Sequence, residues 1–169
     1  NIIYPPFVKK NATGTYVAVK EREQLLTYFL QNIFRKPSFR HGQLPILSRS
    51  LSDKTTIGLL PTGGGKSLTY QLSSILHPGV TIVVAPLVSL MVDQVRGLHT
   101  LRIDASDCVN GGMDGKTKAK KLNMLQNGSL QFMLLSPERF MMENFRESLI
   151  SMTEKNQIYF AYGVIDEVH

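Results

Sequence analysis

Hydrophobic and polar positions follow two different periods along this chain, and the change of period marks its elements. Between residues 23 and 35, apolar side chains recur at helical spacing, which predicts an amphipathic helix that Pro37 ends. A second, short helix is expected over residues 43–50. From residue 56 onward, short apolar runs alternate with helical stretches, a pattern typical of alternating strands and helices.

Four of the apolar runs are long enough for buried strands, and each leads into polar residues. We expect strands at residues 56–60, 80–86, 130–137 and 159–166. We expect helices between them at residues 66–76, 89–98, 118–128 and 139–152. Continuous apolar strands joined by helices predict an α/β fold, in which a mostly parallel sheet carries helices on both faces. In such folds the ligand crevice lies at the carboxyl ends of the strands.

The first residues of the chain do not follow this pattern. Residues 1–22 contain Pro5, Pro6 and Gly14 and show neither period, so we expect an extension or a linker there. The remainder of the 169-residue chain, residues 23–169, is long enough for one α/β domain with its own core.

Composition and charge narrow the class of protein. Apolar residues make up 43% and charged residues 19%, which is the balance of a globular protein, and no apolar run approaches the ~20 residues of a membrane span. We therefore expect no membrane association, and we see no export signal, which predicts an intracellular protein. The lone Cys108 excludes an internal disulfide within this segment. The net charge of +6 favours a polyanionic partner such as nucleic acid.

A glycine-rich stretch, PTGGGKS at residues 61–67, lies between an expected strand and an expected helix. This is the context of a phosphate-binding loop, because successive glycine N–H groups can turn inward and form an anion site at the helix N-terminus. In such a loop Lys66 contacts the β- and γ-phosphates, and the Ser67 hydroxyl binds magnesium. The full pattern has a glycine where this chain has Leu60, so a glycine-rich turn without nucleotide stays open at this point. The candidate phosphate-binding residues are Thr62, Gly63, Gly64, Gly65, Lys66 and Ser67.

Two adjacent carboxylates, Asp166 and Glu167, follow the last apolar run. In a nucleoside triphosphatase the first carboxylate of such a pair binds magnesium, and the second activates the attacking water. An isolated pair of this kind is more often a solvated turn. Here the pair follows a glycine loop, with strands and helices between them, which favours the catalytic interpretation of Lys66, Asp166 and Glu167.

Five segments resemble, in order and spacing, the helicase motifs of the RecQ family within superfamily 2. They are FRHGQ (39–43), LLPTGGGKSLTYQ (59–71), VVAPLVSLMVDQV (83–95), LLSPERFM (134–141) and VIDEVH (164–169). The resemblance covers roughly residues 25–169 and implies an ATP-dependent DNA helicase, whose first motor domain is a RecA-like P-loop NTPase that binds ATP and Mg²⁺. It also implies single-stranded or partly duplex DNA as a partner, together with a second RecA-like domain of the same chain.

The same resemblance implies further site residues. Gln43 would read the adenine edge, which suits a side-chain amide because it donates and accepts at once, and Arg40 would contact the nucleotide. Family members often carry a base-stacking aromatic residue where this chain has Lys36. The residues expected to line the path of nucleic acid are Ser89, Gln94, Ser136 and Arg139.

Two alternatives remain: a superfamily 2 translocase that acts on RNA or on duplexes without unwinding them, and a non-catalytic nucleic-acid-binding module.

The lysine-rich run at residues 116–121 is interpreted as a solvated helix face, because it lacks interleaved aromatic residues. In the family, an aromatic-rich loop beyond this segment couples nucleic-acid binding to hydrolysis, and an arginine of the second domain completes the ATP site. We therefore expect these 169 residues alone to hydrolyse ATP poorly. Helical spacing predicts core positions at Leu87, Leu90, Met91 and Val95.

Overall fold

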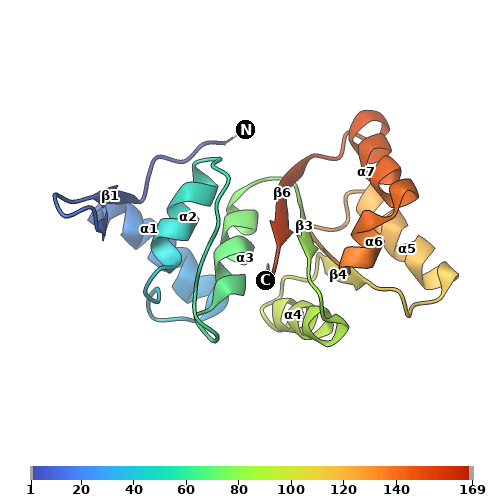
Figure 1. Ribbon diagram of the computed structural model, residues 1–169, viewed down its shortest axis with the longest axis horizontal. Coiled ribbons are helices and arrows are strands. Elements are labelled where there is room, and N and C mark those ends of the chain that lie inside the picture. The colour runs from blue at the N-terminus through green and yellow to red at the C-terminus, as the bar shows by residue number, and fades with distance from the viewer. Residues whose placement is uncertain (1, 168–169) are drawn as a thin grey trace. The chain divides into compact units, whose positions relative to one another are not determined.

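The computed structural model describes residues 2–167 of the chain, which divides into two compact units. Unit 1 comprises Asn1–His77 and unit 2 comprises Pro78–His169 (Figure 1). None of the helices within residues 2–167 is long and apolar enough to cross a membrane.

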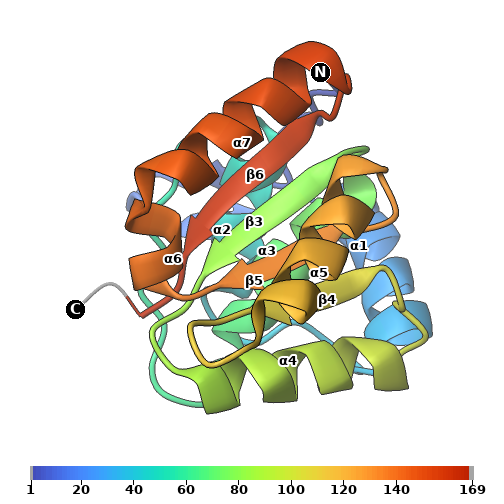
Figure 2. The same cartoon turned by 90° about the vertical axis from the view of Figure 1, so that its right-hand side faces the viewer.

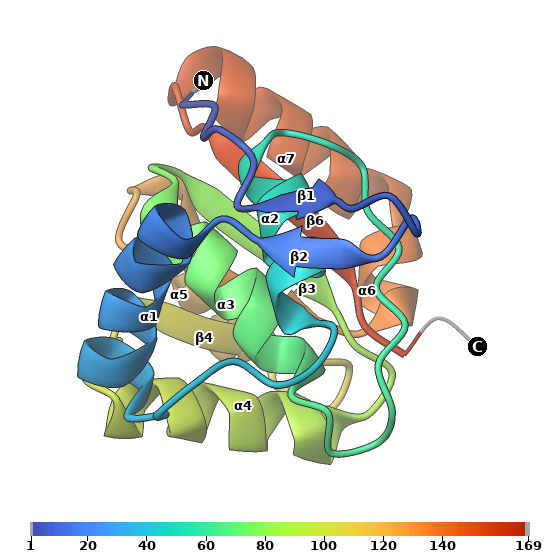
Figure 3. The ribbon, with the colours of Figure 1, turned by 90° about the vertical axis from the view of Figure 1, so that its left-hand side faces the viewer.

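Within residues 2–77, unit 1 forms one antiparallel hairpin and three helices (Figure 3). The hairpin consists of β1 (Val8–Lys10) and β2 (Tyr16–Ala18), and the helices are α1 (Lys20–Phe34), α2 (Gln43–Leu51) and α3 (Lys66–Leu76). The helices confirm the three predicted in this part of the sequence, although α1 begins earlier than predicted. Acidic side chains in the first turn of α1 complement the positive end of its dipole, and Arg35 ends the helix in a left-handed conformation.

The core of unit 1 joins the hairpin to the helices. Phe7 and Val8 are buried together with Leu26, Leu44 and Leu51. The Phe7 backbone N–H also donates to the Ser48 hydroxyl at 2.8 Å, inside the core. The segment for which we expect an extension or linker therefore contains an ordered hairpin. Strands of three residues are too short for a period of two to be visible in the sequence, so the pattern missed them.

The strand predicted at residues 56–60 is absent from the structure, and this prediction is wrong. Residues 54–60 have no regular secondary structure, and the side chains of Ile57 and Leu59 are 88% and 90% exposed. An apolar run becomes a strand only where a neighbouring backbone can pair with its N–H and C=O groups. No residue in the described range pairs with this segment in a sheet.

Unit 2 is built on a parallel sheet with the strand order β4-β5-β3-β6. Its described strands are β3 (Val80–Val84), β4 (Ser106–Val109), β5 (Phe132–Leu135) and β6 (Phe160–Ile165). Every pairing in this sheet is parallel. The sheet confirms the predicted α/β fold and three of the four strands predicted from apolar runs. The fourth strand of the described sheet, β4, lies in the β-like stretch around Cys108.

Two helices, α5 (Gly115–Gln126) and α7 (Glu143–Lys155), cover one face of this sheet (Figure 2). Their buried side chains pack with inward-facing residues of the strands in one apolar cluster, which includes Leu125, Phe145 and Met152 from the helices and Ile82, Met133 and Leu135 from the strands. The helix α4 (Val88–Thr100) packs beside β4, where His99 Nε2 lies 2.9 Å from the Ser106 carbonyl oxygen. A single turn of helix, α6 (Pro137–Met141), follows β5.

The central strands explain why the sequence reads as continuous apolar runs. All five residues of β3 and all four of β5 are buried, because both faces and both edges of these strands are covered. By contrast β6 lies at the edge of the described sheet, and Ile165 at its end is 66% exposed. Because the strands are parallel, the polar residues that follow β3, β5 and β6 emerge along one edge of the sheet.

Candidate functional site

The glycine loop of unit 1 forms a tight turn directly before α3. The Gly64 N–H donates to the Pro61 carbonyl oxygen at 2.8 Å, which closes the turn. Gly63 and Gly65 adopt positive φ angles of 73° and 77°, a region that favours glycine. The loop thus places Lys66 and Ser67 in the first turn of α3, as the sequence predicts.

Gln43 fastens the start of α2 to this loop. Its Nε2 donates to the carbonyl oxygens of Gly64 and Gly65, at 3.1 Å each, and its Oε1 accepts from the Arg40 backbone N–H at 2.8 Å. The side chain is only 2% exposed. The amide that the resemblance assigns to adenine therefore holds the loop in this structure, and its role in reading a base stays a prediction.

Gly65 is the glycine with the least room. A Cβ atom built on it would lie 2.5 Å from Gln43 Nε2, whereas a Cβ atom on Gly63 would meet nothing within 4 Å. The cradle in front of α3 therefore exists because no side chain fills it. An open, glycine-lined turn at a helix N-terminus is suited to an anionic group such as a phosphate.

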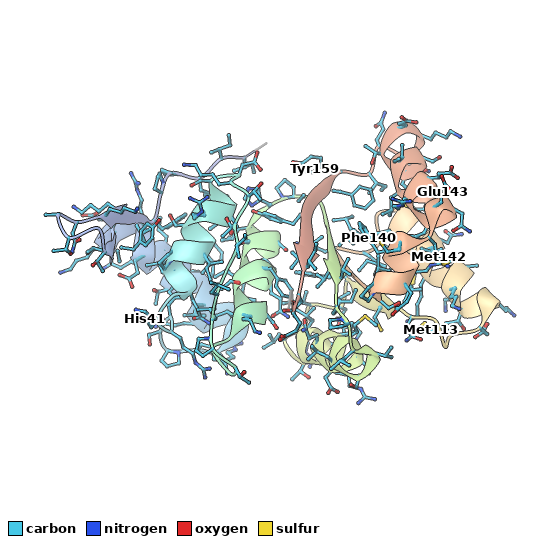
Figure 4. All side chains as sticks on the ribbon, in the orientation of Figure 1. His41, Met113, Phe140, Met142, Glu143 and Tyr159 are labelled. Atoms are coloured by element: carbon cyan, nitrogen blue, oxygen red, sulfur yellow. The ribbon has the colours of Figure 1, made fainter. Side chains whose placement is uncertain are left out.

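Arg40 also contacts the loop, because its guanidinium donates to the Gly63 carbonyl oxygen. His41, labelled in Figure 4, follows it in the turn that leads into α2. Lys66 and Ser67 are half-buried, and Thr62 is exposed at the loop. Arg40, Gln43 and the loop residues thus lie together, although the first two precede the loop by about twenty positions in the sequence.

Alanine substitutions at the two glycines are expected to separate conformational strain from lost contacts. Gly63→Ala should destabilise the protein by about 1 kcal/mol through its positive φ alone. Gly65→Ala should cost about 2–3 kcal/mol, because the new Cβ also displaces the Gln43 amide from its carbonyl partners. Urea unfolding followed by circular dichroism measures both. Equal losses for the two variants would show that the Gln43 contact does not stabilise the loop.

In unit 2 the predicted acidic pair follows β6. The Asp166 backbone N–H donates to the Val84 carbonyl oxygen at 2.8 Å, which extends the pairing of β6 with β3 by one residue. The Asp166 side chain is 9% exposed, and its Oδ1 accepts from the Glu167 N–H at 3.1 Å. Glu167 is half-buried and has a left-handed φ of 57°. The last two residues of the VIDEVH motif, Val168 and His169, lie outside the described residues.

Gln94 of α4 reaches this carboxylate. Its Nε2 donates to Asp166 Oδ2 at 3.3 Å, across 72 positions of sequence. We expected Gln94 on the path of nucleic acid, and nothing in the sequence pattern indicates its contact with Asp166. The structure thus brings one predicted nucleic-acid residue against one predicted magnesium ligand.

Near the start of the same helix, Ser89 is exposed, so its hydroxyl is accessible to nucleic acid. Met91 and Val95 are buried and Leu90 is half-buried, which agrees with their expected packing. Leu87 is 60% exposed, so its predicted core position is wrong. It precedes the first turn of α4 as the N-cap residue, where helical spacing does not apply.

Ser136 and Arg139, the two predicted nucleic-acid residues after β5, lie in different surroundings. Ser136 is 4% exposed and stands as the N-cap residue of α6. Arg139 lies with its guanidinium carbon 5.2 Å from the centre of the Phe145 ring, and its Nη1 donates to Met142 Sδ at 3.5 Å. Phe140 and Met142 belong to the same corner between α6 and α7 (Figure 4). A phosphate contact by Arg139 is a prediction that this packing does not test.

Other features of unit 2 stand apart from these residues. Burial raises the pKa of the Cys108 thiol, which keeps it protonated and unsuited to nucleophilic chemistry. Within the lysine-rich run, Lys118 donates to the Gly111 carbonyl oxygen, and Lys121 donates to Asp107 and to the Cys108 carbonyl oxygen. An open groove of about 550 Å³ between α5 and α7 is lined by none of the predicted site residues.

The glycine loop, its buried glutamine and the aspartate after β6 are features of nucleotide-dependent motor proteins. A family model for DEAD/DEAH box helicases matches residues 40–169, which include all three features. The chain belongs to the DEAD/DEAH box helicase family.

Curated relatives of the chain are RecQ-type helicases. It is 33% identical over 153 residues to ATP-dependent DNA helicase Q-like 5 of Arabidopsis thaliana, a match that covers 90% of this chain. It is 34% identical over 140 residues to ATP-dependent DNA helicase RecQ of Haemophilus influenzae and 36% identical over 140 residues to probable ATP-dependent DNA helicase RecS of Bacillus subtilis, each over 83% of this chain. The chain spans only 16%, 22% and 27% of the lengths of these three proteins.

Proposed function

We propose that residues 23–169 act as the first RecA-like motor domain of a RecQ-type, ATP-dependent DNA helicase. The observation that carries this proposal is the buried Gln43, whose amide holds the carbonyl oxygens of Gly64 and Gly65 directly before α3. Such a contact shapes a loop whose backbone N–H groups and helix N-terminus suit the phosphates of a nucleotide. Family membership and the RecQ-type relatives support ATP as that nucleotide.

The residues present fit ATP with Mg²⁺. In the proposal, Thr62 and the three glycines contact the phosphates through their backbone, and Lys66 neutralises the charge of the β- and γ-phosphates. The Ser67 hydroxyl of unit 1 and the Asp166 carboxylate of unit 2 each carry oxygen of the kind that magnesium prefers. When bound, the metal offsets the negative charge that develops during phosphoryl transfer. Arg40 and Gln43 contact the nucleotide beside the loop.

The two carboxylates of the acidic pair, Asp166 and Glu167, have different proposed roles. Asp166 is held by its backbone to β3 and by its side chain to Gln94, so its carboxylate has a fixed orientation. A fixed carboxylate suits a metal ligand, because no reorganisation is needed when the ion binds. Glu167 orients and activates the attacking water.

Nucleic acid is the proposed second ligand, as single-stranded or partly duplex DNA. Ser89 follows β3 at the carboxyl edge of the sheet and is exposed, so its hydroxyl can contact a phosphate. Ser136 follows β5 at the same edge but is only 4% exposed, so its place in this set rests on the motif alone. Gln94 and Arg139 extend this set. In the full-length protein a second RecA-like domain completes the motor, and ATP hydrolysis drives the two domains along one strand.

Strand displacement by the full-length protein tests this proposal against its first alternative. Matched DNA and RNA duplexes, each with a single-stranded tail, are incubated with ATP and Mg²⁺. We expect separation of the DNA duplex that depends on ATP. Unwinding of RNA alone, or ATP hydrolysis without unwinding of either duplex, would favour a different superfamily 2 translocase.

Gln94→Leu is expected to change the magnesium requirement of ATP hydrolysis. Removing the donor to Asp166 Oδ2 leaves the carboxylate held, among the described residues, only at Oδ1 by the Glu167 N–H, and loss of such a partner typically weakens metal binding by about tenfold. The concentration of Mg²⁺ for half-maximal hydrolysis should rise accordingly, and Gln94→Asn should restore part of the loss. A variant with an unchanged magnesium requirement and weakened DNA binding would assign Gln94 to nucleic acid alone.

A further inference from the structure

The positive charge of the chain is unevenly distributed. Residues 1–77 contain ten Lys and Arg against three Asp and Glu, whereas residues 78–169 contain nine against ten. The whole excess therefore belongs to unit 1. Part of it is occupied by protein contacts, because Arg22 donates to the Pro6 carbonyl oxygen at 2.6 Å and Arg49 donates to that of Thr55 at 3.1 Å.

Three further cations of unit 1 belong to one short stretch of chain. Lys9 and Lys10 lie on β1, and Lys20 begins α1 directly after β2. All three are exposed. An excess of exposed cations on a small element is the electrostatic signature of a surface for a polyanion.

An aromatic side chain accompanies these lysines. Tyr16 is paired with Lys10 across the hairpin, and Lys10 Nζ lies 5.4 Å from the centre of the Tyr16 ring. The ring is on a residue that is 44% exposed, beside Val17, which is 42% exposed. Exposed aromatic rings beside basic groups are how proteins bind single strands, because a base stacks on the ring while its phosphates meet the cations.

The hairpin is held firmly enough to present these groups. Asn11 Oδ1 accepts from the backbone N–H groups of Thr13 at 3.1 Å and Thr15 at 2.9 Å, which fixes the turn. At the other end, the Val19 N–H donates to the Phe7 carbonyl oxygen at 2.9 Å, next to the buried core. A preorganised surface loses less entropy when it binds a ligand.

We propose that the exposed groups of the hairpin bind single-stranded DNA: Lys10 and Tyr16 on one face, Lys9 on the other, and Lys20 directly after β2, together called the hairpin surface. It lies before residues 40–169, the part matched by the helicase family model, so it is an addition to the contacts of the motor motifs. The inference rests on the proposed function, which supplies the single strand. Lysines on exposed strands also discourage pairing between molecules, but that role requires no exposed tyrosine beside them.

The test is binding of the full-length protein to fluorescent oligothymidylate, measured by anisotropy without nucleotide over a range of salt. In the triple variant Lys9→Gln, Lys10→Gln, Lys20→Gln, the slope of log K against log salt should decrease by about 2, since each contact with a single strand contributes about 0.7. Tyr16→Leu should weaken binding about fivefold or more without a change of slope, because it removes stacking and no charge.

A matched control removes the same charge from unit 2. Lys116, Lys120 and Lys155 are exposed, and their replacement by glutamine should leave the affinity within about twofold of the parent. The same affinity and slope in the hairpin variant and this control would overturn the proposal. If the parent protein unwinds DNA while the hairpin variants bind normally, only this inference fails; a parent that neither binds DNA nor hydrolyses ATP contradicts the proposed function itself.

Discussion

Lys66→Ala should lower the rate of ATP hydrolysis by the full-length protein about 100- to 1,000-fold, which is the usual cost of removing one preorganised charge from a reacting centre. Lys66 begins α3 directly after the left-handed Gly65, so its ammonium is attached to the rigid end of a helix. Alanine keeps the helix, because it has the highest helix propensity, and removes only the charge. The rate is measured at saturating ATP, Mg²⁺ and single-stranded DNA.

The control for this variant is Lys54→Ala, which removes an exposed lysine of the same unit that belongs to none of the proposed contacts. Its rate should stay within about twofold of the parent, since isolated surface charges contribute little. Thermal unfolding should be similar for both variants and the parent. A Lys66→Ala protein that hydrolyses ATP at the parent rate would remove the catalytic role of the glycine loop and revive the non-catalytic binding module.

Asp166→Asn should have the second-largest effect, a loss of about 100-fold or more in hydrolysis at cellular concentrations of Mg²⁺. Asparagine has the same shape and keeps the Asp166 position at the end of β6, but it lacks the negative charge that holds a divalent cation. The backbone hydrogen bond to Val84 is unaffected by the change. Binding of a fluorescent nucleotide without metal should be nearly unchanged, because the glycine loop is intact.

Asp93→Asn is the matched control, because Asp93 is an exposed aspartate of the same unit that pairs with the exposed Arg96 at 3.9 Å. We expect it to hydrolyse ATP at the parent rate, since an exposed pair of this kind contributes little to stability. If Asp166→Asn and Asp93→Asn behaved alike, the acidic pair would be a solvated turn rather than part of the site.

The sequence predicts the parts of the fold that depend on local pattern. The apolar runs of β3 and β5 are visible because both strands are buried on both faces, so nearly every position is apolar. The run at residues 56–60 is also mostly apolar but has no partner strand among residues 2–167, and pairing is a tertiary property that composition does not encode. The hairpin of residues 8–18 was missed because its strands are too short for a recognisable period.

In the candidate site, too, the sequence predicts what depends on local pattern and misses what depends on tertiary contacts. The sequence alone predicts the glycine loop and the acidic pair as parts of a site, because phosphate and magnesium binding require particular residues at a particular spacing. It does not reveal that Gln43 holds the loop or that Gln94 reaches Asp166, because these contacts join residues 21 or more positions apart and depend on how the helices pack. Arg139 shows the opposite case, since a residue chosen for nucleic acid lies against the Phe145 ring.

The most direct test of the central claim is the rate of ATP hydrolysis by the full-length protein, measured with and without single-stranded DNA at fixed ATP and Mg²⁺. The account predicts hydrolysis that DNA stimulates at least about tenfold, which is the gain expected when binding of a second ligand completes a catalytic site. It also predicts that Lys66→Ala and Asp166→Asn lower both the basal and the stimulated rates by about 100-fold or more. Hydrolysis that is absent in the parent, or that DNA leaves unchanged, would contradict a DNA-dependent motor.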